Sequence, residues 1–300
     1  MVAMILVRRA IDPRYRAGRG TPRGGVTGAG WSGHPPPPRG TTVSAMPQPV
    51  LHPYLDHPGT LAFAHRGGTE AHPENSLAAF RHAVDLGFAY LETDVHATAD
   101  GVVIAFHDVA LDRVTDRTGR ISDLSWAEVA EARIDGTQPI PLLEDLLTAF
   151  PGVRINIDPK DDRVVDPLVD VLRDHGAMER VCLGSFSDRR LRRCRDLMGP
   201  DLCTSAGPLA VARFRLSSLG LPVGRPAARC LQVPVRQGGI PLVDQRLVGH
   251  AHRRGLQVHV WTIDDPDEMH RLLDLGVDGI MTDQPSLLRS VLIDRDDWVA

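Results

Sequence analysis

Eight short β-rich runs alternate along this chain with eight amphipathic helical stretches, and this alternation constrains the fold more than any other feature of the sequence. The β-rich runs cover residues 61–65, 90–95, 154–158, 181–186, 202–205, 230–235, 257–262 and 279–282. Helical stretches such as "SLAAFRHAVDLG" and "DPDEMHRLLDLG" separate them, and the chain closes with "QPSLLRSVLI". Many of these stretches end in Gly, the usual C-terminal stop of a helix.

Strands that alternate with helices in this way are typical of an α/β protein with a parallel sheet. Eight such units over roughly 240 residues predict a (β/α)8 (TIM) barrel. A doubly wound open sheet is the alternative arrangement, but the number of units favours closure.

Composition limits the environment in which the chain works. Four cysteines stand at Cys182, Cys194, Cys203 and Cys230, with no C-x-x-C spacing, which indicates buried, reduced thiols in a cytoplasmic protein. No apolar run approaches the roughly 20 residues that span a bilayer, so we expect no stable membrane insertion.

The first 50 residues differ in composition from the rest. Up to Ser44 they hold seven basic residues and one acidic residue, with Gly-rich stretches and the run "HPPPPRG". Such a segment cannot bury enough apolar surface to fold, so residues 1–50 are expected to be a disordered leader and residues 51–300 the folded domain. An alternative is that translation starts at Met46. The remaining residues carry 27 basic and 37 acidic side chains, a formal charge of −10, which argues against a nucleic-acid partner.

In a (β/α)8 barrel the chemistry takes place at the carboxyl ends of the strands. The sequence places polar groups there in one strand after another: His65 and Arg66, Glu92 and Asp94, Asp158 and Lys160, Trp261, and Asp283. Glu92 and Asp94 are two residues apart on a strand and therefore face the same side.

The stretch "HATADGVVIAFHD" after the second strand predicts a hairpin. Asp100-Gly101 is a strong signal for a two-residue turn. With such a turn, His107 would lie directly opposite Asp94, and a longer loop would shift this register by a residue or two.

Each of these residues also has an ordinary structural interpretation. A single histidine is more often structural than catalytic, Trp261 could be core, and Asp283 is expected to cap the last helix. Lys160, however, is the only lysine among 34 basic side chains, the rest being arginine. Its position at a strand end indicates a site that needs the compact charge of a lysine ammonium rather than the planar, forked guanidinium of arginine.

These residue types suit phosphate chemistry. Carboxylates drawn together are typical ligands of a hard divalent cation such as Mg²⁺ or Ca²⁺, with Mn²⁺ a third choice. A lysine and an arginine beside them could bind phosphate, and two histidines could act as general acid and base. The sequence therefore predicts metal-assisted cleavage of a phosphate ester.

The ordered motifs "HRGG", "HPENSLAAF", "LETDVHATADGVVIAFHD", "INIDPK", "VHVWTID" and "GVDGIMTD" resemble those of the glycerophosphodiester phosphodiesterase family. The resemblance extends from Leu61 to the C-terminus. It implies a (β/α)8 barrel with a small insertion after the second strand, here about 107–140. It also implies hydrolysis of glycerophosphodiesters, which are small-molecule substrates, to glycerol 3-phosphate and an alcohol.

The resemblance assigns roles to individual residues. It implies that His65 and His107 are the acid–base pair, and that the remaining matched residues bind phosphate or metal: Arg66 and Lys160 the phosphate, and Glu92, Asp94 and Asp158 the cation. Trp261 is expected to contact the substrate. The chain departs from the family's pattern at Asp158, where glutamate is common, and at Asp264, where asparagine is frequent.

Two other functions stay open, and the basic leader could in addition be a binding tail that anchors the protein to anionic surfaces. The barrel also resembles phospholipase D-type enzymes that act on lysophospholipids or sphingolipids, which should expose an apolar or aromatic loop. It could instead be a non-catalytic phosphate-binding barrel, although the presence of both histidines and all three carboxylates argues against this. The alcohol, the metal and the oligomeric state do not follow from the sequence.

Overall fold

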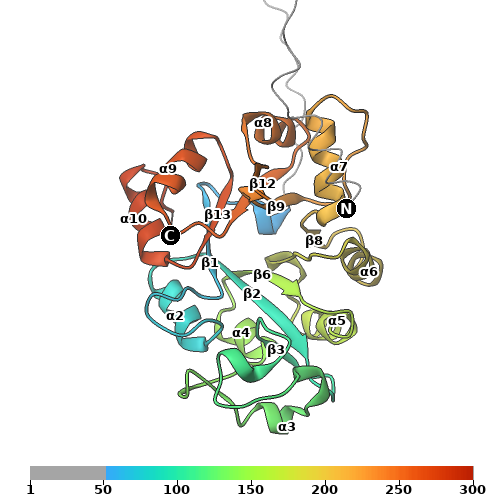
Figure 1. Cartoon of the computed structure of the whole chain (residues 1–300), viewed down its shortest axis with the longest axis vertical. Helices are drawn as coiled ribbons and strands as arrows, with labels where there is room; N and C mark the ends of the chain where they lie inside the picture. The colour runs from blue at the N-terminus through green and yellow to red at the C-terminus, as the bar shows by residue number, and fades with distance from the viewer. Residues whose placement is uncertain (1–51, 300) are drawn as a thin grey trace, which may run out of the picture. The chain divides into compact units, whose positions relative to one another are not determined.

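The computed structural model describes residues 52–299, and the predicted leader and the alternative start at Met46 lie outside them. Within the described residues, each β-rich run predicted from the sequence contains a parallel strand (Figure 1). The strands are β1 (Leu61–His65), β2 (Tyr90–Ala97), β6 (Arg154–Pro159), β7 (Val181–Leu183), β8 (Cys203–Thr204), β9 (Cys230–Pro234), β12 (Gln257–Trp261) and β13 (Gly279–Thr282).

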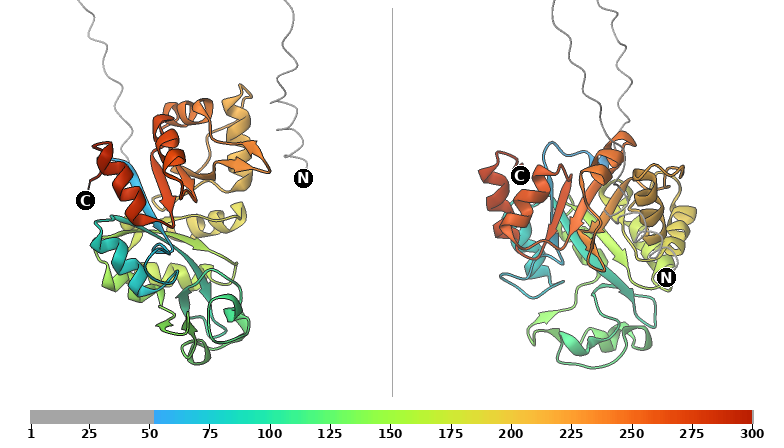
Figure 2. Two further views of the ribbon diagram at one scale, coloured as in Figure 1. Left: turned by 60° about the vertical axis from the view of Figure 1, so that its left-hand side comes forward. Right: turned by 45° about the horizontal axis from the view of Figure 1, so that its top comes forward.

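Helices follow these strands and surround them on the outside, as Figures 1 and 2 show. All eight predicted helices are present: α2 (Leu77–Asp85), α4 (Leu143–Ala149), α5 (Val165–Asp174), α6 (Asp188–Met198), α7 (Pro208–Ser218), α8 (Gln245–Arg253), α9 (Pro266–Asp274) and α10 (Pro285–Asp294). Their apolar faces pack against the strands in one large core cluster, to which Leu168 of α5 and Leu247 of α8 belong. The stretches predicted to be amphipathic therefore form the outer layer of helices, although α7 shows almost no separation of apolar and polar faces.

The order of the strands decides between a barrel and an open sheet. It runs β8-β7-β6-β2-β1-β13-β12-β9, and neighbours in this order are parallel. The two outer strands meet through a bridge between Ser205 and Cys230 and through a hydrogen bond from the Arg229 amide to the Thr204 carbonyl (2.9 Å). This nearly closed ring confirms the (β/α)8 barrel and excludes the doubly wound sheet.

Apolar side chains fill the barrel at the amino ends of its strands. The short 3-10 helix η2 (Pro53–Leu55) covers this end, and the Tyr90 hydroxyl donates to the Tyr54 carbonyl (2.7 Å). We call this cluster the closed end; it comprises Tyr54, Leu55, Leu61, Phe63, Tyr90, Cys182, Cys203, Cys230 and Met281. All four cysteines of the chain are buried free thiols, as predicted, and three of them lie here.

Between β2 and α4 the chain forms a separate group of short elements (Figure 1). They are β3 (Val103–Ala105), η3 (Leu111–Arg113), η4 (Ile121–Asp123), α3 (Trp126–Val129), β4 (Arg133–Ile134) and β5 (Gln138–Pro139). This segment contains the region expected to be an insertion, about 107–140, and has an apolar cluster of its own around Phe106 and Ile121. Three further short elements lie elsewhere: η5 (Met178–Arg180), β10 (Arg236–Gln237) and β11 (Ile240–Pro241).

The predicted register of the hairpin after β2 is wrong by one residue. Val95 pairs with Ala105, so that Phe106 follows opposite Asp94 and its amide donates to the Asp94 carbonyl (2.9 Å). The loop has three residues rather than two, because Thr98 already pairs with Val102. His107 therefore lies one residue beyond the position opposite Asp94.

None of the helices in the described part of the chain combines the length and the apolar character that crossing a bilayer requires.

Candidate active site

The turn after β1 combines a charged side chain with two glycines. Arg66 has a φ of 53°, which is uncommon for a residue with a side chain, and Gly67 and Gly68 have φ values of 84° and 86°. A Cβ on Gly67 would lie 2.8 Å from a backbone nitrogen of α2, and one on Gly68 would lie 2.5 Å from Pro285. Glycine is therefore required at both positions. The turn brings the backbone N–H of Arg66 within hydrogen-bond distance of the Glu92 side chain on the neighbouring strand β2.

Arg66 contacts three carboxylates from this turn. Its backbone N–H donates to Glu92 Oε2 (3.1 Å), and its Nε lies 3.1 Å from Asp94 Oδ2. Its Nη1 donates to Glu74 Oε1 (3.0 Å). A backbone outlier that is held by this many contacts is typical of a functional site.

Glu92 is buried beside other charges. Its Oε2 lies 3.8 Å from Nε2 of His65, its neighbour across the β1–β2 pair. Burial and the adjacent negative charge of Asp94 raise the pKa of Glu92 to about 7. A solvent-exposed glutamate would ionise near its ordinary pKa. The raised pKa of Glu92 therefore means that its surroundings disfavour the charged form, and a nearby cation would reverse this effect.

Lys160 joins the carboxylates of two neighbouring strands. Asp94 of β2 is in register with Asp158 of β6, and both are buried. Lys160 Nζ lies 2.6 Å from Asp94 Oδ1 and 2.9 Å from Asp158 Oδ2. Burial opposes the charge of Lys160, but the two carboxylates outweigh it and raise the lysine pKa; burial raises the pKa of Asp158. The chain's only lysine is thus an ionised contact of two predicted metal ligands.

Asp283 orients the first histidine, and its predicted role as a helix cap is wrong. The N-cap residue of α10 is Gln284, and it makes no side-chain capping bond. Asp283 Oδ1 instead lies 2.6 Å from Nδ1 of His65. Burial lowers the pKa of His65, but Glu92 and Asp283 reverse this effect, so the histidine pKa is raised.

Asp264 shapes the same corner of the site. Its Oδ1 accepts hydrogen bonds from the Thr282 hydroxyl (2.9 Å) and from the backbone N–H of Asp283 (2.7 Å). Asp264 is one of the two positions at which the sequence is expected to depart from the family's pattern. In this structure its carboxylate fixes the loop that carries the partner of His65.

His107 is oriented in a similar way by its neighbour in sequence. Its Nδ1 lies 2.6 Å from Asp108 Oδ1, and Arg113 Nε donates to Asp108 Oδ2 (2.5 Å). The backbone carbonyl of His107 lies 3.1 Å from Nε2 of the buried His96. No direct contact joins the His107 side chain to His65 among the described residues; the two histidines are linked through intervening ion pairs.

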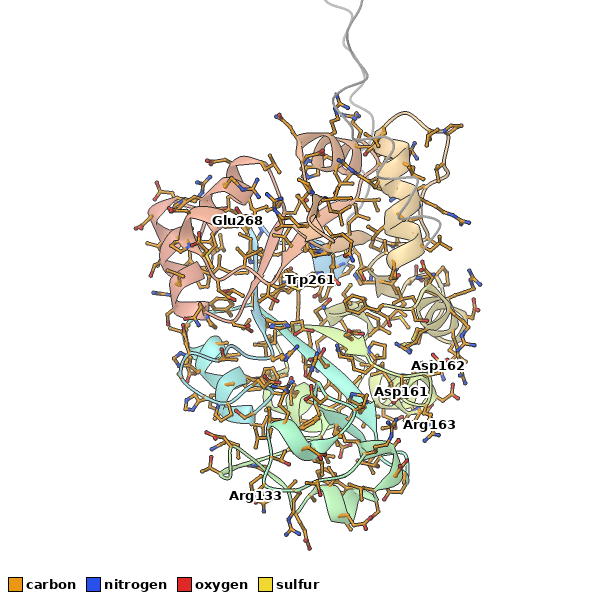
Figure 3. The ribbon with its side chains drawn as sticks, viewed as in Figure 1. Arg133, Asp161, Asp162, Arg163, Trp261 and Glu268 are labelled. Atoms are coloured by element: carbon orange, nitrogen blue, oxygen red, sulfur yellow. The ribbon has the colours of Figure 1, made fainter. Side chains whose placement is uncertain are left out.

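Trp261 lies near the middle of the ribbon among the barrel strands, whereas Asp161 and Asp162 lie beside α5 (Figure 3). The Trp261 ring packs edge-on against the ring of Phe186, with centroids 5.7 Å apart. Phe186 is 68% exposed. Among the described residues, the Trp261 side chain makes no polar contact with the charged group around Lys160, so its part in the site is an aromatic surface.

Comparison with known proteins agrees with this geometry. The model of the Glycerophosphoryl diester phosphodiesterase family matches residues 65–287. The chain belongs to the glycerophosphodiester phosphodiesterase family.

Relatives within and beyond bacteria support the assignment. The chain is 44% identical over 254 residues to "Probable glycerophosphodiester phosphodiesterase 2" of Mycobacterium tuberculosis, covering 82% of this chain and 95% of that protein. It is 28% identical over 266 residues to human "Lysophospholipase D GDPD1", covering 76% and 85%. A phosphodiesterase from Oleispira antarctica, solved with the product sn-glycerol-3-phosphate, has the same fold at a TM-score of 0.67 and 24% identity, covering 78% of this chain and 97% of that one.

The carboxylates predicted to bind a cation do not form a recognisable metal cluster in the described part of the chain. Within residues 52–299 no group of three or more histidine, cysteine or acidic side chains has the arrangement of a metal site. The buried Asp158 Oδ1 nevertheless has no hydrogen-bond partner among the described residues, and Asp94 Oδ2 has only the ion-pair contact with Arg66 Nε. Oxygen donors of this kind, together with the raised pKa of Glu92, fit a hard divalent cation.

The sequence predicts no catalytic or binding role for several residues of the candidate site, and for Asp283 it predicts only that of a helix cap. Asp283, Asp108, Glu74 and Arg113 hold the groups that the sequence does predict. Signals for three of them were present: Asp283 follows a strand end, Asp108 follows His107, and Glu74 lies in the motif "HPENS". Arg113 had no such signal, because its role depends on how the segment after β3 folds back.

Proposed function

We propose that the carboxyl end of the barrel hydrolyses glycerophosphodiesters to glycerol 3-phosphate and an alcohol, with a divalent cation and two histidines as acid–base pair. The observation that carries this proposal is the cluster in which three buried carboxylates, Glu92, Asp94 and Asp158, meet the half-buried cations Arg66 and Lys160. Burying so many charges is unfavourable for folding alone. Its presence in a member of this enzyme family favours a role in binding and transforming a charged substrate.

Glu92, Asp94 and Asp158 would hold the cation through their oxygen atoms. When bound, Mg²⁺, Ca²⁺ or Mn²⁺ would polarise the phosphoryl group. Asp158 is one methylene shorter than glutamate, so its reach is the most restricted of the three. Arg66 and Lys160 supply positive charge for the phosphate, in a partly buried site where such contacts are strong.

His65 and His107 each use Nδ1 for a carboxylate, Asp283 and Asp108 respectively. This leaves Nε2 of each ring to take or give a proton. One histidine would accept the proton of the attacking hydroxyl or water, and the other would protonate the leaving alcohol. The carboxylate partners fix the orientation of each ring, and at His65 the charges of Glu92 and Asp283 outweigh burial and raise the pKa.

A specific observation supports a second substrate class. The exposed Phe186 packs edge-on against the half-buried Trp261 at the end of β12, and such an aromatic surface would suit contact with an acyl chain. The human relative's name is lysophospholipase D. Lysophospholipids therefore belong in the substrate panel beside water-soluble glycerophosphodiesters.

Product analysis tests the proposal. Purified protein is incubated with glycerophosphocholine, glycerophosphoethanolamine, glycerophosphoinositol and lysophosphatidylcholine, and released glycerol 3-phosphate, free alcohol and any cyclic phosphate are quantified. We expect activity that vanishes in EDTA and returns with Mg²⁺, Ca²⁺ or Mn²⁺. Full activity in excess EDTA would show that the carboxylates have another role.

Two variants test the most unusual ligand. Asp158→Glu should keep more activity than Asp158→Ala, because it restores the commoner ligand. Equal losses in the two variants would remove Asp158 from the ligand set.

We further propose that residues 51–300 form the catalytic unit, with about 107–140 as its insertion, and that it works in the cytoplasm without nucleic-acid partners. The buried free thiols support a reducing compartment. A chain that starts at Met46 should retain the kcat of the full chain on the same substrate. A large loss of kcat on this truncation would show that the first residues contribute to catalysis.

A further inference from the structure

Arg113 lies between the two halves of the candidate site. It ends η3, in the segment that follows β3, and its guanidinium contacts two carboxylates at once. Nε donates to Asp108 Oδ2 (2.5 Å) and Nη2 to Asp108 Oδ1 (3.1 Å). Nη2 also donates to Glu74 Oε1 (2.7 Å), and Nη1 to Glu74 Oε2 (3.2 Å). The fork of the arginine is therefore bidentate on both acids.

Each of the two acids holds a different residue of the site. Asp108 contacts Nδ1 of His107 at 2.6 Å, and Glu74 accepts from Nη1 of Arg66 at 3.0 Å. Arg113 is the shared partner, so a single side chain connects the acid–base group carried after β3 with the phosphate-binding group carried after β1. The continuous path runs His107–Asp108–Arg113–Glu74–Arg66 and then reaches Asp94.

We propose that Arg113 is a positioning residue, which fixes the placement of His107 relative to Arg66 and thereby relative to the phosphate. This inference rests on the proposed function of the same site. Arg113 itself contacts neither histidine nor, among the described residues, the carboxylates proposed to bind the cation. It acts through Asp108 and Glu74.

The electrostatics agree with this role. The hydrogen bond from Arg113, followed by that from His107, overcomes partial burial and holds the pKa of Asp108 at about 2. Burial opposes ionisation of Glu74, but the hydrogen bond from Arg113 and the charge of Arg66 lower its pKa. Both acids are thus ionised over the pH range in which an enzyme of this type would work, and each needs a cation. Without Arg113, Glu74 would have Arg66 as its remaining cationic partner and would compete with the phosphate for it.

Packing gives no equivalent reason for an arginine here. The side chain of Arg113 is 47% exposed, and it does not belong to the apolar cluster of its segment, which Leu111 and Ile121 help to form. Its replacement should leave the fold intact. A nearby control exists in Arg117, which is 55% exposed and pairs with Glu131 at 3.2 Å in the same segment.

Steady-state kinetics on the best glycerophosphodiester tests the proposal. Arg113→Met should lower kcat/KM by about 10²-fold, the effect expected when a catalytic group is misplaced by about 1 Å. Arg113→Lys should restore little of it, because an ammonium cannot bind two carboxylates with a planar fork. Arg117→Met should leave kcat/KM within about twofold of wild type. Added guanidinium at non-denaturing concentration should recover part of the activity of Arg113→Met and none of that lost in His107→Ala.

A double-mutant cycle shows whether Arg113 acts through Asp108. Asp108→Asn and Arg113→Met should each lower kcat. The kcat of the double variant should be little lower than that of the less active single variant. Losses that multiply would show that the two residues act separately and would overturn the proposal. Near wild-type kinetics of Arg113→Met would do the same.

An observation that does not need activity separates this inference from the proposed function. The ¹⁵N resonances of the His107 ring should move in Arg113→Met and stay in place in Arg117→Met. Unmoved His107 resonances would refute the positioning role even if no substrate were found. A wild-type protein that hydrolyses no glycerophosphodiester, with His107 resonances that do respond to Arg113→Met, would instead refute the proposed function alone.

Discussion

The two ends of the barrel are made by the same eight strands, yet they hold opposite kinds of side chain. At the carboxyl ends lie buried carboxylates such as Glu92 and Asp94, with Arg66 and Lys160 beside them. At the closed end the interior is filled by aromatic rings and thiols, among them Tyr54 and Phe63. A strand has no intrinsic reason to be polar at one end, so the difference reflects what each end does.

The comparison has an energetic side. Apolar burial at the closed end stabilises the fold, by about 1.5–3 kcal/mol for each large side chain. Buried charges at the carboxyl end bring a desolvation penalty that their mutual attraction only partly offsets. Substitutions at the two ends should therefore have different effects. Those at the carboxyl end should lower turnover, and those at the closed end should lower stability.

The largest expected effect is at the histidines. His65→Ala and His107→Ala should each lower kcat by about 10²–10⁴-fold, because each removes a general acid or base. The melting temperature should change little, since neither side chain belongs to an apolar core cluster. His175→Ala, at the end of α5, is the control and should leave kcat unchanged. If His65→Ala or His107→Ala lost much stability and kept activity, that histidine would have a structural role. The carboxyl end would then also contribute to stability.

The reverse behaviour is expected at the closed end. Tyr54→Ala removes a fully buried ring that packs edge-on against Tyr90 with centroids 5.4 Å apart. The free energy of unfolding should fall by about 3–5 kcal/mol, as for other large aromatic truncations. Urea denaturation measures this loss, and kcat per folded molecule should stay near wild type. A strong fall in kcat at temperatures where the variant is folded would mean that the two ends are coupled.

Lys160 tests whether the carboxyl end needs a specific cation. Lys160→Ala should raise the activation free energy by about 3–4 kcal/mol, by analogy with loss of an oxyanion-hole donor. Lys160→Arg should recover little, because the longer planar group cannot fit between Asp94 and Asp158 as the ammonium does. Arg192→Lys, on the outer face of α6, should leave steady-state kinetics intact. Near wild-type turnover of Lys160→Arg would make the solitary lysine an accident of composition.

The raised pKa of Glu92 predicts a pH dependence of stability in metal-free protein. Its pKa in the fold is about 7, above the ordinary value of 4.5, so the folded state holds the proton more tightly than the unfolded state. The stability that this group contributes is fully present below pH 4.5 and is lost as pH rises through 7. At about 1.4 kcal/mol per pKa unit the loss is about 3 kcal/mol. Urea titrations in EDTA should show this decline, and Glu92→Gln should flatten it. An unchanged slope in Glu92→Gln would assign the decline to another group.

The sequence predicts the architecture well and the connections within the site poorly. The period of each run and the terminal glycines are local signals, and all eight strands and eight helices follow from them. The hairpin register is wrong because Asp100-Gly101 is compatible with two loops. Gly101 has a φ of 86°, which a three-residue loop also uses, and the Thr98 hydroxyl accepts from the Val102 amide (3.0 Å) to close it.

The partners of the histidines show what kind of information is missing. His65 and Asp283 are 218 residues apart in the chain, and their contact depends on how the ring of strands closes. Arg113 and Glu74 depend in addition on the fold of the segment after β3. Strand ends predict which residues gather, because the topology places them together. They do not predict which atoms pair, because that depends on side-chain conformations fixed only in the assembled barrel.

The smallest expected effect distinguishes two tyrosine hydroxyls at the closed end. The Tyr90 hydroxyl donates to the Tyr54 carbonyl, whereas the Tyr54 hydroxyl is buried and has no hydrogen-bond partner among the described residues. Tyr90→Phe should therefore lower the free energy of unfolding by about 1 kcal/mol, the typical net value of one buried hydrogen bond. Tyr54→Phe should be neutral or slightly stabilising, because it removes an unpaired polar atom and keeps the ring. Urea denaturation of both variants measures the difference, and kcat should not change in either. If Tyr54→Phe lowered the free energy of unfolding more than Tyr90→Phe, the Tyr54 hydroxyl would have a hydrogen-bond partner at the closed end. The closed end would then depend on polar interactions as well as on apolar burial, and its contrast with the charged carboxyl end would be smaller.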